Sequence, residues 1–367
     1  MKPTSLPCRN AYCRLPNLVR RSVKSDKPCR IIVTIPATEE SNATSILECP
    51  LCGSLFHEVN NEELINELVQ EHGFDEQYVA SIFNQINYLP QLIENISKPA
   101  EKTKTWEEYR NIFITPKRIA AGILFYNQHK ELLTRVENET GVPKNILLGI
   151  LGVETSFGRI QGNYRVIDSL YTLVAGYPPR SAFFKQQLIH LFYLSREQNL
   201  PIESIKGSYA GAMGAPQFIP SSYRDFAIDG NSDGKIDLFN SWDDVLMSIG
   251  NYLEKNGWRT NENILSETSL ANNANGMTKE TLNDFSNYFS KAIKPNHSIE
   301  ELKSAGFVFS STLQNNSRAQ PIYLEGSNKE KSFIGFHNFY VITTYNRNVM
   351  YALAVYQLGD SIQFILD

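Results

Sequence analysis

The segment Gly149-Ile-Leu-Gly-Val-Glu-Thr-Ser-Phe-Gly-Arg159 carries a single carboxylate at the end of an apolar run. Just upstream and within it, four apolar residues recur at helical spacing and predict one buried stripe: Ile146, Leu147, Ile150 and Leu151. Glu154 follows Ile150 by four residues and Leu147 by seven, so the pattern predicts that it lies on the same helix face.

A carboxyl group at this position has a predicted pKa above its ordinary value. Desolvation on an apolar face disfavours the charged form of Glu154. The partial negative charge at a helix C-terminus disfavours it further. A carboxylic acid that keeps its proton near neutral pH is suited to act as the general acid of a glycosidase. The alternative from this segment alone is an exposed, idle glutamate at a frayed helix end.

The bulk composition is that of an ordinary globular protein large enough for two or three domains. The chain has 367 residues, of which 42% are hydrophobic and 20% charged, and its net charge is −4. This charge predicts no general attraction to nucleic acid. We find no apolar run close to the roughly 18 residues of a membrane span.

The five cysteines all lie in the first 52 residues, which we interpret as part of a leader over 1–55. Cys49-Pro-Leu-Cys52 has the spacing of half a zinc knuckle, and the alternative is a poorly ordered leader without metal. Residues 1–30 are basic, but neither a signal peptide nor a lipobox can be recognised.

The rest of the chain predicts a mainly helical, α+β protein. Helical patterns occur over 60–95 with a break at 72–73, 106–137 with a restart at 116, the run up to Glu154, 168–175, 181–198 and 350–364. Residues 307–309 and 322–324 resemble strands, and 339–345 reads as a strand or an extended segment. Asp168 is interpreted as a helix cap, with a second catalytic carboxylate as the alternative.

A second informative block, Lys206 to Tyr223, is rich in glycine, amides and aromatic rings. Its glycines permit close backbone approach, while Ser208 and Gln217 add hydrogen-bonding groups. Such a loop suits an extended polar ligand such as a glycan. A tight helix-packing turn explains the block equally well.

A third block follows the first part of an EF-hand calcium loop. Side-chain oxygens at loop positions 1, 3, 5 and 9 and a backbone carbonyl at position 7 would be contributed by Asp229, Asn231, Asp233, Asp237 and Lys235. Position 12 is Asn240 instead of glutamate, so the loop would be longer and closed by Asp243 or Asp244. One loop without a pair favours structural Ca²⁺, and a solvated Asx-rich turn is the alternative.

Taken in order, these blocks resemble the membrane-bound lytic transglycosylase B family of bacterial cell-wall enzymes. The similarity runs from about residue 60 to the C-terminus. It rests on these motifs: 152–159, 177–180, 207–214, 217–223, the Asp-rich loop, 251–252 and 345–351. The resemblance implies a lysozyme-like core, a helical subdomain and a small sheet-containing subdomain. The corresponding division is 56–140 helical, 141–262 core with the calcium loop, 263–332 mixed insertion and 333–367 return to the core.

The resemblance also implies roles for individual residues. Glu154 takes the position of the family's only catalytic acid/base, and Asp243 that of the closing calcium ligand. The substrate-binding positions are Arg180, Ser208, Gln217, Tyr252, Tyr345, Asn346 and Tyr351. The substrate implied is peptidoglycan, cut between N-acetylmuramic acid and N-acetylglucosamine with closure of a 1,6-anhydro ring.

Two other functions remain open at this point. A hydrolytic muramidase on the same core would need a second carboxylate, such as Asp168 or Asp225. A calcium-dependent glycan-binding protein would need none. For the transglycosylase we expect a monomer in the periplasm, either free or associated with the outer membrane or a cell-wall complex. The periplasmic expectation rests on the substrate alone.

Overall fold

The computed structural model describes residues 6–7, 28–35, 44–48, 55–57, 61–98, 103–270, 291–309, 313–324 and 331–367. The chain divides into two compact units, each made of two segments. Unit 1 contains Met1–Lys98 and Gln161–Asp225, and unit 2 contains Pro99–Ile160 and Phe226–Asp367. The predicted mainly helical fold with a small antiparallel sheet is confirmed. The Cys49–Cys52 motif lies outside the described residues.

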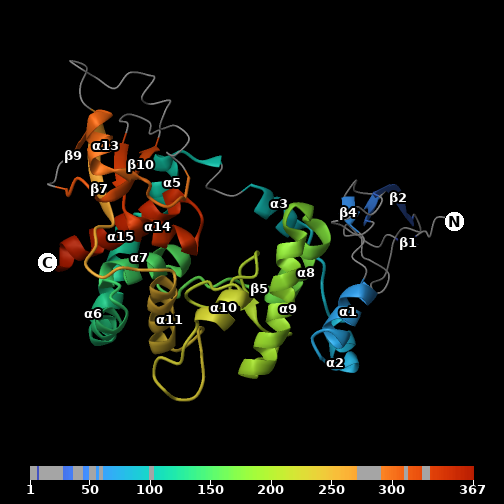
Figure 1. The fold of residues 1–367 in the computed structure, drawn as a ribbon. Coiled ribbons are helices and arrows are strands. Elements are labelled where there is room, and N and C mark those ends of the chain that lie inside the picture. The colour runs from blue at the N-terminus through green and yellow to red at the C-terminus, as the bar shows by residue number, and fades with distance from the viewer. Residues whose placement is uncertain are drawn as a thin grey trace. The chain divides into compact units, whose positions relative to one another are not determined.

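Unit 1 is built around a pair of helices that pack along each other, α8 and α9 (Figure 1). Its helices are α1 (Asn61–Gln70), α2 (Glu76–Phe83), α3 (Gln91–Ser97), α8 (Val166–Gly176), α9 (Ser181–Gln198) and α10 (Pro220–Phe226), the last ending in unit 2. A four-stranded antiparallel sheet has the order β1 (Leu6–Pro7), β2 (Pro28–Ile35), β3 (Thr44–Glu48) and β4 (Leu55–His57). Phe83, Tyr171 and Phe192 are buried in the core, where aromatic rings supply much of the apolar area.

Unit 2 is organised by the contact between helices α7 and α15. Its helices are α5 (Trp106–Phe113), α6 (Pro116–Thr140), α7 (Lys144–Thr155), α11 (Trp242–Lys255), α13 (Ile299–Ser304), α14 (His337–Tyr345) and α15 (Val349–Leu366). A Cβ on Gly149 would lie 2.2 Å from the carbonyl oxygen of Val355, so this glycine permits the close approach. Helix α7 is buried on all sides from Ile146 to Val153, which corrects the prediction of a single buried stripe.

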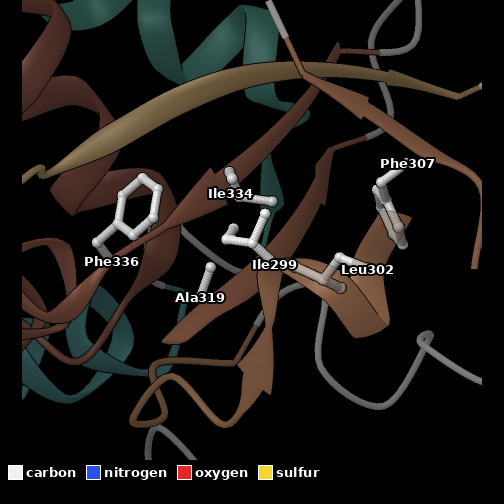
Figure 2. Close-up of a cluster of buried hydrophobic side chains, with 6 residues drawn as sticks. All are labelled: Ile299, Leu302, Phe307, Ala319, Ile334 and Phe336. Atoms are coloured by element: carbon white, nitrogen blue, oxygen red, sulfur yellow. The ribbon is translucent and has the colours of Figure 1, made fainter. Parts of the chain in front are cut away.

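A five-stranded antiparallel sheet completes unit 2. Its order is β8 (His297–Ser298), β10 (Arg318–Leu324), β11 (Lys331–Gly335), β7 (Leu265–Leu270) and β9 (Phe307–Phe309). The predicted strands over 307–309 and 322–324 are therefore confirmed. Figure 2 shows the apolar cluster between this sheet and α13: Ile299, Leu302, Phe307, Ala319, Ile334 and Phe336.

Two expectations about the C-terminal region are wrong. Residues 339–345 form most of α14 instead of a strand. Helix α15 is long and apolar enough to cross a membrane by length and composition, which differs from the expectation that no apolar run approaches that length. More than half of α15 is buried inside the protein, against α7, α6 and α14, which is the environment of a core helix.

Candidate active site

Glu154 occupies the last turn of α7, next to an unusual turn of the backbone. It is half-buried, although the residues on both sides of it are buried. Three successive residues then have positive φ: Ser156 (51°), Phe157 (61°) and Gly158 (76°). A left-handed conformation is costly for a bulky residue such as phenylalanine, and such strain is retained where the surroundings enforce it.

The ring of Phe157 is what holds this turn. A Cβ on Gly152 or on Gly122 would lie 2.9 Å or 2.8 Å from its Cζ atom, so both glycines make room for the ring. The ring centroid also lies 5.6 Å from that of Phe125 on α6. The helix end that presents Glu154 is therefore fixed by packing on two helices.

Two tyrosines surround the Glu154 carboxyl group. The Tyr351 hydroxyl donates a hydrogen bond of 2.5 Å to Glu154 Oε1. Burial raises the pKa of Tyr351 well above 10, and the charge of Glu154 raises it further. The pKa of Tyr345 is raised well above 10 by the same two causes. Both hydroxyls therefore keep their protons at physiological pH, and the Tyr351 hydroxyl stays a donor to the carboxylate.

A stack of aromatic rings positions Tyr345. Its ring is 6.4 Å from that of Tyr351, with 12° between the planes, and 4.8 Å from the ring of Tyr252. The Tyr252 hydroxyl donates to the Thr344 carbonyl over 2.7 Å, so it anchors the end of α14. Asn346 follows as an exposed residue. Unit 2 thus brings together Glu154, Tyr252, Tyr345 and Tyr351, the last three being predicted substrate-binding residues.

The predicted substrate residues Ser208 and Gln217 lie in unit 1, in a loop of tight turns. The Ser208 hydroxyl accepts hydrogen bonds from the Ala212 and Ala210 N–H groups over 3.0 and 3.3 Å. Gln217 has a φ of 53°, and its Nε2 donates to the carbonyls of Gly214 and Gln161. Both side chains stay half-buried, and their contacts fix the loop.

Arg180, the third predicted substrate residue of unit 1, is exposed at the end of a 3₁₀ turn, Pro178–Arg180. Its guanidinium carbon lies 4.2 Å from the Phe183 ring centroid and 5.2 Å from that of Phe184. These cation–π contacts orient the side chain while its charge remains accessible to solvent.

The interpretation of Asp168 as a helix cap is wrong. Helix α8 begins at Val166, so Asp168 lies inside the first turn and is only 4% exposed. Its carboxylate accepts from the backbone N–H of Asn87 over 2.9 Å and from Asn87 Nδ2 over 3.3 Å. Burial raises its pKa, against the opposing effects of Asn87 and Arg165. These contacts give Asp168 a structural role within unit 1. Asp225 is exposed at the end of that unit.

The Asp-rich loop of unit 2 folds around its own oxygen atoms. Asp229 Oδ1 and Asn231 Oδ1 both accept from the Asp233 N–H, over 3.2 and 3.0 Å. Gly234, with a φ of +87°, donates its N–H to Asp229 Oδ2 over 2.7 Å. The side-chain oxygens of loop positions 1 and 3 thus face the same backbone N–H group, and carboxylate and amide oxygens of this kind suit a hard cation. Asp237, at position 9, accepts from Phe239 and Asn240 instead.

Asp243 and Asp244 differ sharply in their surroundings. Asp244 is buried and accepts from the N–H groups of Gly230 and Asp237, so it ties the two ends of the loop together. Asp243 forms an ion pair with Arg135 over 2.8 Å, and 38% of its side chain is exposed. Asp243 is thus the more accessible of the two carboxylates.

The missed features of the site are the strained Phe157 turn and the anchor of Tyr252 on Thr344. The glycines at positions 122 and 152 are the only sequence signal for the strained Phe157 turn. The residues around Thr344 give no sequence signal for its hydrogen bond with Tyr252, because that bond depends on the contact between α14 and α11.

Comparison with known proteins shows the family of the chain. A family model described as "Transglycosylase SLT domain" matches residues 57–360. The membrane-bound lytic murein transglycosylase B of Escherichia coli (strain K12) is 34% identical over 321 residues, which cover 84% of each chain.

Solved structures show the same relationship. The catenated lytic transglycosylase SltB1 of Pseudomonas aeruginosa matches with a TM-score of 0.76 and 38% identity, over 83% of this chain and 97% of that one. The Escherichia coli transglycosylase Slt35 in complex with calcium matches with a TM-score of 0.72 and 32% identity, over 83% and 93%. SltB3 of Pseudomonas aeruginosa, in complex with NAG-anhNAM-pentapeptide, has a TM-score of 0.67 and 27% identity, over 82% and 78%. The chain belongs to the family of lytic transglycosylases that carry the transglycosylase SLT domain.

Proposed function

We propose that this protein is a lytic transglycosylase that cleaves the β-1,4 bond between N-acetylmuramic acid and N-acetylglucosamine in peptidoglycan. The observation that carries the proposal is Glu154 at the end of the apolar helix α7, with the Tyr351 hydroxyl bonded to it over 2.5 Å. The membership of the chain in the transglycosylase family supports the same activity.

One carboxyl group can serve both halves of this reaction. Protonated Glu154 gives its proton to the leaving glycosidic oxygen, while the acetamido carbonyl of the muramic acid attacks the anomeric carbon. The resulting carboxylate then takes the proton of the C6 hydroxyl group, whose oxygen attacks the anomeric carbon, displaces the acetamido oxygen and closes the 1,6-anhydro ring. No water is consumed, and the second carboxylate of an ordinary glycosidase is not needed. The hydrogen bond from Tyr351 stabilises the carboxylate form of Glu154, which is the form that takes the C6 hydroxyl proton in the second step.

The predicted substrate-binding residues keep that role in the proposal. In unit 2, Tyr345 and Tyr351 offer hydroxyls close to the reacting carboxyl group, and Asn346 is exposed beside them. In unit 1, the exposed charge of Arg180 and the half-buried Ser208 and Gln217 would contact the glycan. Tyr252 would act mainly by holding the end of α14 in place.

We also propose a structural Ca²⁺ ion in the Asp-rich loop. The side chains of Asp229, Asn231, Asp233 and Asp237, the carbonyl of Lys235 and the carboxylate of Asp243 would hold it. The ion would cross-link the loop and neutralise its negative charge, and the chemistry would remain with Glu154. Two observations support this: the converging oxygens of positions 1 and 3, and the calcium complex of Slt35.

The proposed substrate sets the expected location and partners. A relative is described as membrane-bound and acts on murein, which supports a place at the cell wall in the periplasm. Action as a monomer, and membership of a cell-wall complex, remain predictions.

Mass spectrometry of the fragments released from purified peptidoglycan tests the function. Wild type should release muropeptides one water lighter than hydrolysed fragments, and Glu154→Gln, which stays folded, should release none. Ordinary reducing ends would identify a muramidase instead. Turnover by Glu154→Gln would refute the role of Glu154, and no release by wild type would point to a binding protein.

A further inference from the structure

Unit 2 contains a cavity whose lining does not include Glu154, Tyr345 or Tyr351. It has a volume of about 780 Å³, within the range of ligand pockets. Four segments line it: the chain after α11 (259–263), the chain before β8 (294–295), the loop before β10 (313–318) and the start of α14 (336–337). No role in the proposed reaction has been given to any of these residues.

The charge of this pocket is opposite to that of the whole chain. Arg259, Lys294 and Arg318 line it, and Glu262 is the one acidic residue among the lining residues. The chain as a whole has a net charge of −4. A local excess of positive charge in a negative protein attracts an anionic ligand.

The two arginines form exposed ion pairs, and Arg318 Nη1 also donates to the Asn296 carbonyl over 2.8 Å. Arg259 lies 3.4 Å from Glu262, and Arg318 lies 3.6 Å from Glu301, with about half or more of each side chain exposed. Exposed ion pairs of this kind contribute little stability, so a ligand carboxylate can replace them at small cost. The planar guanidinium group binds a carboxylate through two parallel hydrogen bonds.

The walls of the pocket are already fixed by buried groups. Asn338 is 1% exposed, accepts from the Arg259 N–H over 2.9 Å and donates to the carbonyls of Arg259 and Glu262. The Phe336 side chain is anchored in the apolar cluster of Figure 2. The Ser317 carbonyl, also in the lining, accepts from the N–H of Ile299 on α13. Such a preformed site loses little conformational entropy on binding.

The remaining lining suits a peptide. Side-chain amides and a hydroxyl line the pocket beside the charges: Asn261, Asn263, Gln314, Asn316 and Ser317. These groups can donate to and accept from backbone amides, and Leu313, Pro295 and Phe336 add apolar contacts. The combination of separated cations with amide groups favours a peptide that carries several carboxylates over a simple inorganic anion.

Helix α14 connects the pocket to the Glu154 site. Its first residue, His337, lines the pocket, and its last, Tyr345, stacks on Tyr351. Eight residue steps at 1.5 Å separate them by about 12 Å along the helix. An extended peptide covers this distance in about four residues.

We propose that the pocket binds the carboxylates of the stem peptide that peptidoglycan carries, and so selects strands with intact acidic stems. This inference rests on the proposed function for its substrate. The stem can belong to the strand being cut or to a neighbouring strand, because both present the same carboxylates.

Direct binding tests the pocket independently of catalysis. Isothermal titration of the full-length protein with the free acidic stem pentapeptide should show binding, and the same peptide with its carboxylates amidated should not bind. Arg318→Gln and Arg259→Gln should each weaken binding by about tenfold, the size of one charge-assisted hydrogen bond. Lys255→Gln removes an exposed positive charge at the end of α11, outside the pocket lining, and should bind as wild type does.

Kinetics then distinguishes the source of the stem. If the stem of the cut strand binds, the two arginine variants should lose about tenfold in kcat/KM on peptide-bearing strands and nothing on strands stripped of peptide. Inhibition of stripped-strand cleavage by added pentapeptide, abolished in Arg318→Gln, would indicate a neighbouring strand.

Three results would overturn the inference: equal binding of the amidated peptide, equally tight binding of inorganic phosphate, or unchanged binding by both arginine variants. If wild type cuts no strands, the proposed function fails, while the titration still decides whether the pocket binds the stem peptide.

Discussion

The hydroxyl group of Tyr351 on α15 donates a hydrogen bond to Oε1 of Glu154 at the end of α7, over 2.5 Å. The two residues are 197 positions apart in the chain, and the packing of α7 on α15 brings them together. Because the bond is stronger to the charged carboxylate than to the neutral acid, it stabilises the carboxylate form of Glu154. It therefore acts against the apolar helix and its C-terminus, which favour the neutral acid.

Replacing Tyr351 with phenylalanine should shift the pH profile of activity. Loss of the donor removes this stabilisation of the carboxylate, so the alkaline limb of the activity profile, where the acid form of Glu154 is lost, should move to higher pH. The limb does not report on Tyr351 itself, because the pKa of that hydroxyl lies well above 10. The measurement is the pH dependence of kcat/KM for wild type and variant.

Tyr356→Phe is the matched control for this change. Tyr356 is a half-buried tyrosine on the same helix, with a pKa raised by burial. Its substitution should leave the pH profile unchanged. An alkaline limb that stays in place in Tyr351→Phe would contradict the proposed role of the hydrogen bond.

Gly152→Ala should damage catalysis more than stability alone explains. The new Cβ would lie 2.9 Å from Cζ of Phe157 and 2.7 Å from Cδ2 of Leu358, so the ring and the strained turn must move. Overpacking of this kind costs about 1–3 kcal/mol. A displaced Glu154 should lower kcat by about tenfold or more. Gly122→Ala reaches the same ring from α6 and should act in the same direction.

Gly359→Ala separates a general loss of stability from a displacement of Glu154. Its Cβ would lie 2.0 Å from the carbonyl oxygen of Asn145, at the other end of the α7–α15 contact. This variant should lose stability, measured by urea unfolding, yet keep its kcat at temperatures where it is folded. Equal losses of kcat in Gly152→Ala and Gly359→Ala would show that the Phe157 turn has no special role.

Local sequence patterns were sufficient for much of this architecture. The apolar run before Glu154 predicted α7 and its end, because burial and helical spacing agree there. The residues 339–345 misled the prediction, since β-branched and aromatic residues favour strands. Tertiary contacts override that preference: Asn338 is buried on the carbonyls of Arg259 and Glu262, and Tyr252 bonds to Thr344.

The sequence predicted which residues belong to the candidate site, but it did not predict how their side chains contact one another. Glu154, Tyr345 and Tyr351 could be named from motifs, but their contacts need two helices distant in sequence. The left-handed Phe157 could not be foreseen, because its backbone conformation opposes the intrinsic preference of phenylalanine. The local sequence does not reveal the role of Asp168, because its partner, Asn87, lies 81 positions away.

Calcium should raise the melting temperature of the protein without changing kcat. An ion bound only by the folded state stabilises it by about 2.7 kcal/mol when present at 100 times its Kd. Asp229→Ala removes loop position 1 and should abolish the difference between calcium and chelator, and Asp243→Ala should do the same. Asp360→Ala, an exposed carboxylate on α15, is the control that should keep the full response. An identical melting temperature of wild type in calcium and chelator would argue against the site.

Asp244→Ala should differ from the ligand variants. Its carboxylate accepts from the N–H groups of Gly230 and Asp237, so its removal leaves two backbone donors without an acceptor. The melting temperature should therefore fall in chelator as well as in calcium. A drop seen only in calcium would identify Asp244, in place of Asp243, as the closing ligand.

Asp168→Asn tests the muramidase alternative and the burial of this carboxyl group together. Since Asp168 is buried on Asn87, the variant should keep releasing fragments one water lighter, and a loss of those products would implicate Asp168 in catalysis.

Burial raises the folded pKa of Asp168 above the unfolded value of about 3.9, so the folded state binds the proton more tightly. Its contribution to stability is then greatest below that pH and is lost as pH rises through the folded pKa. Urea unfolding at about pH 4 and pH 7 should show wild type losing free energy of unfolding relative to Asp168→Asn at the higher pH, and a constant difference would contradict this reading.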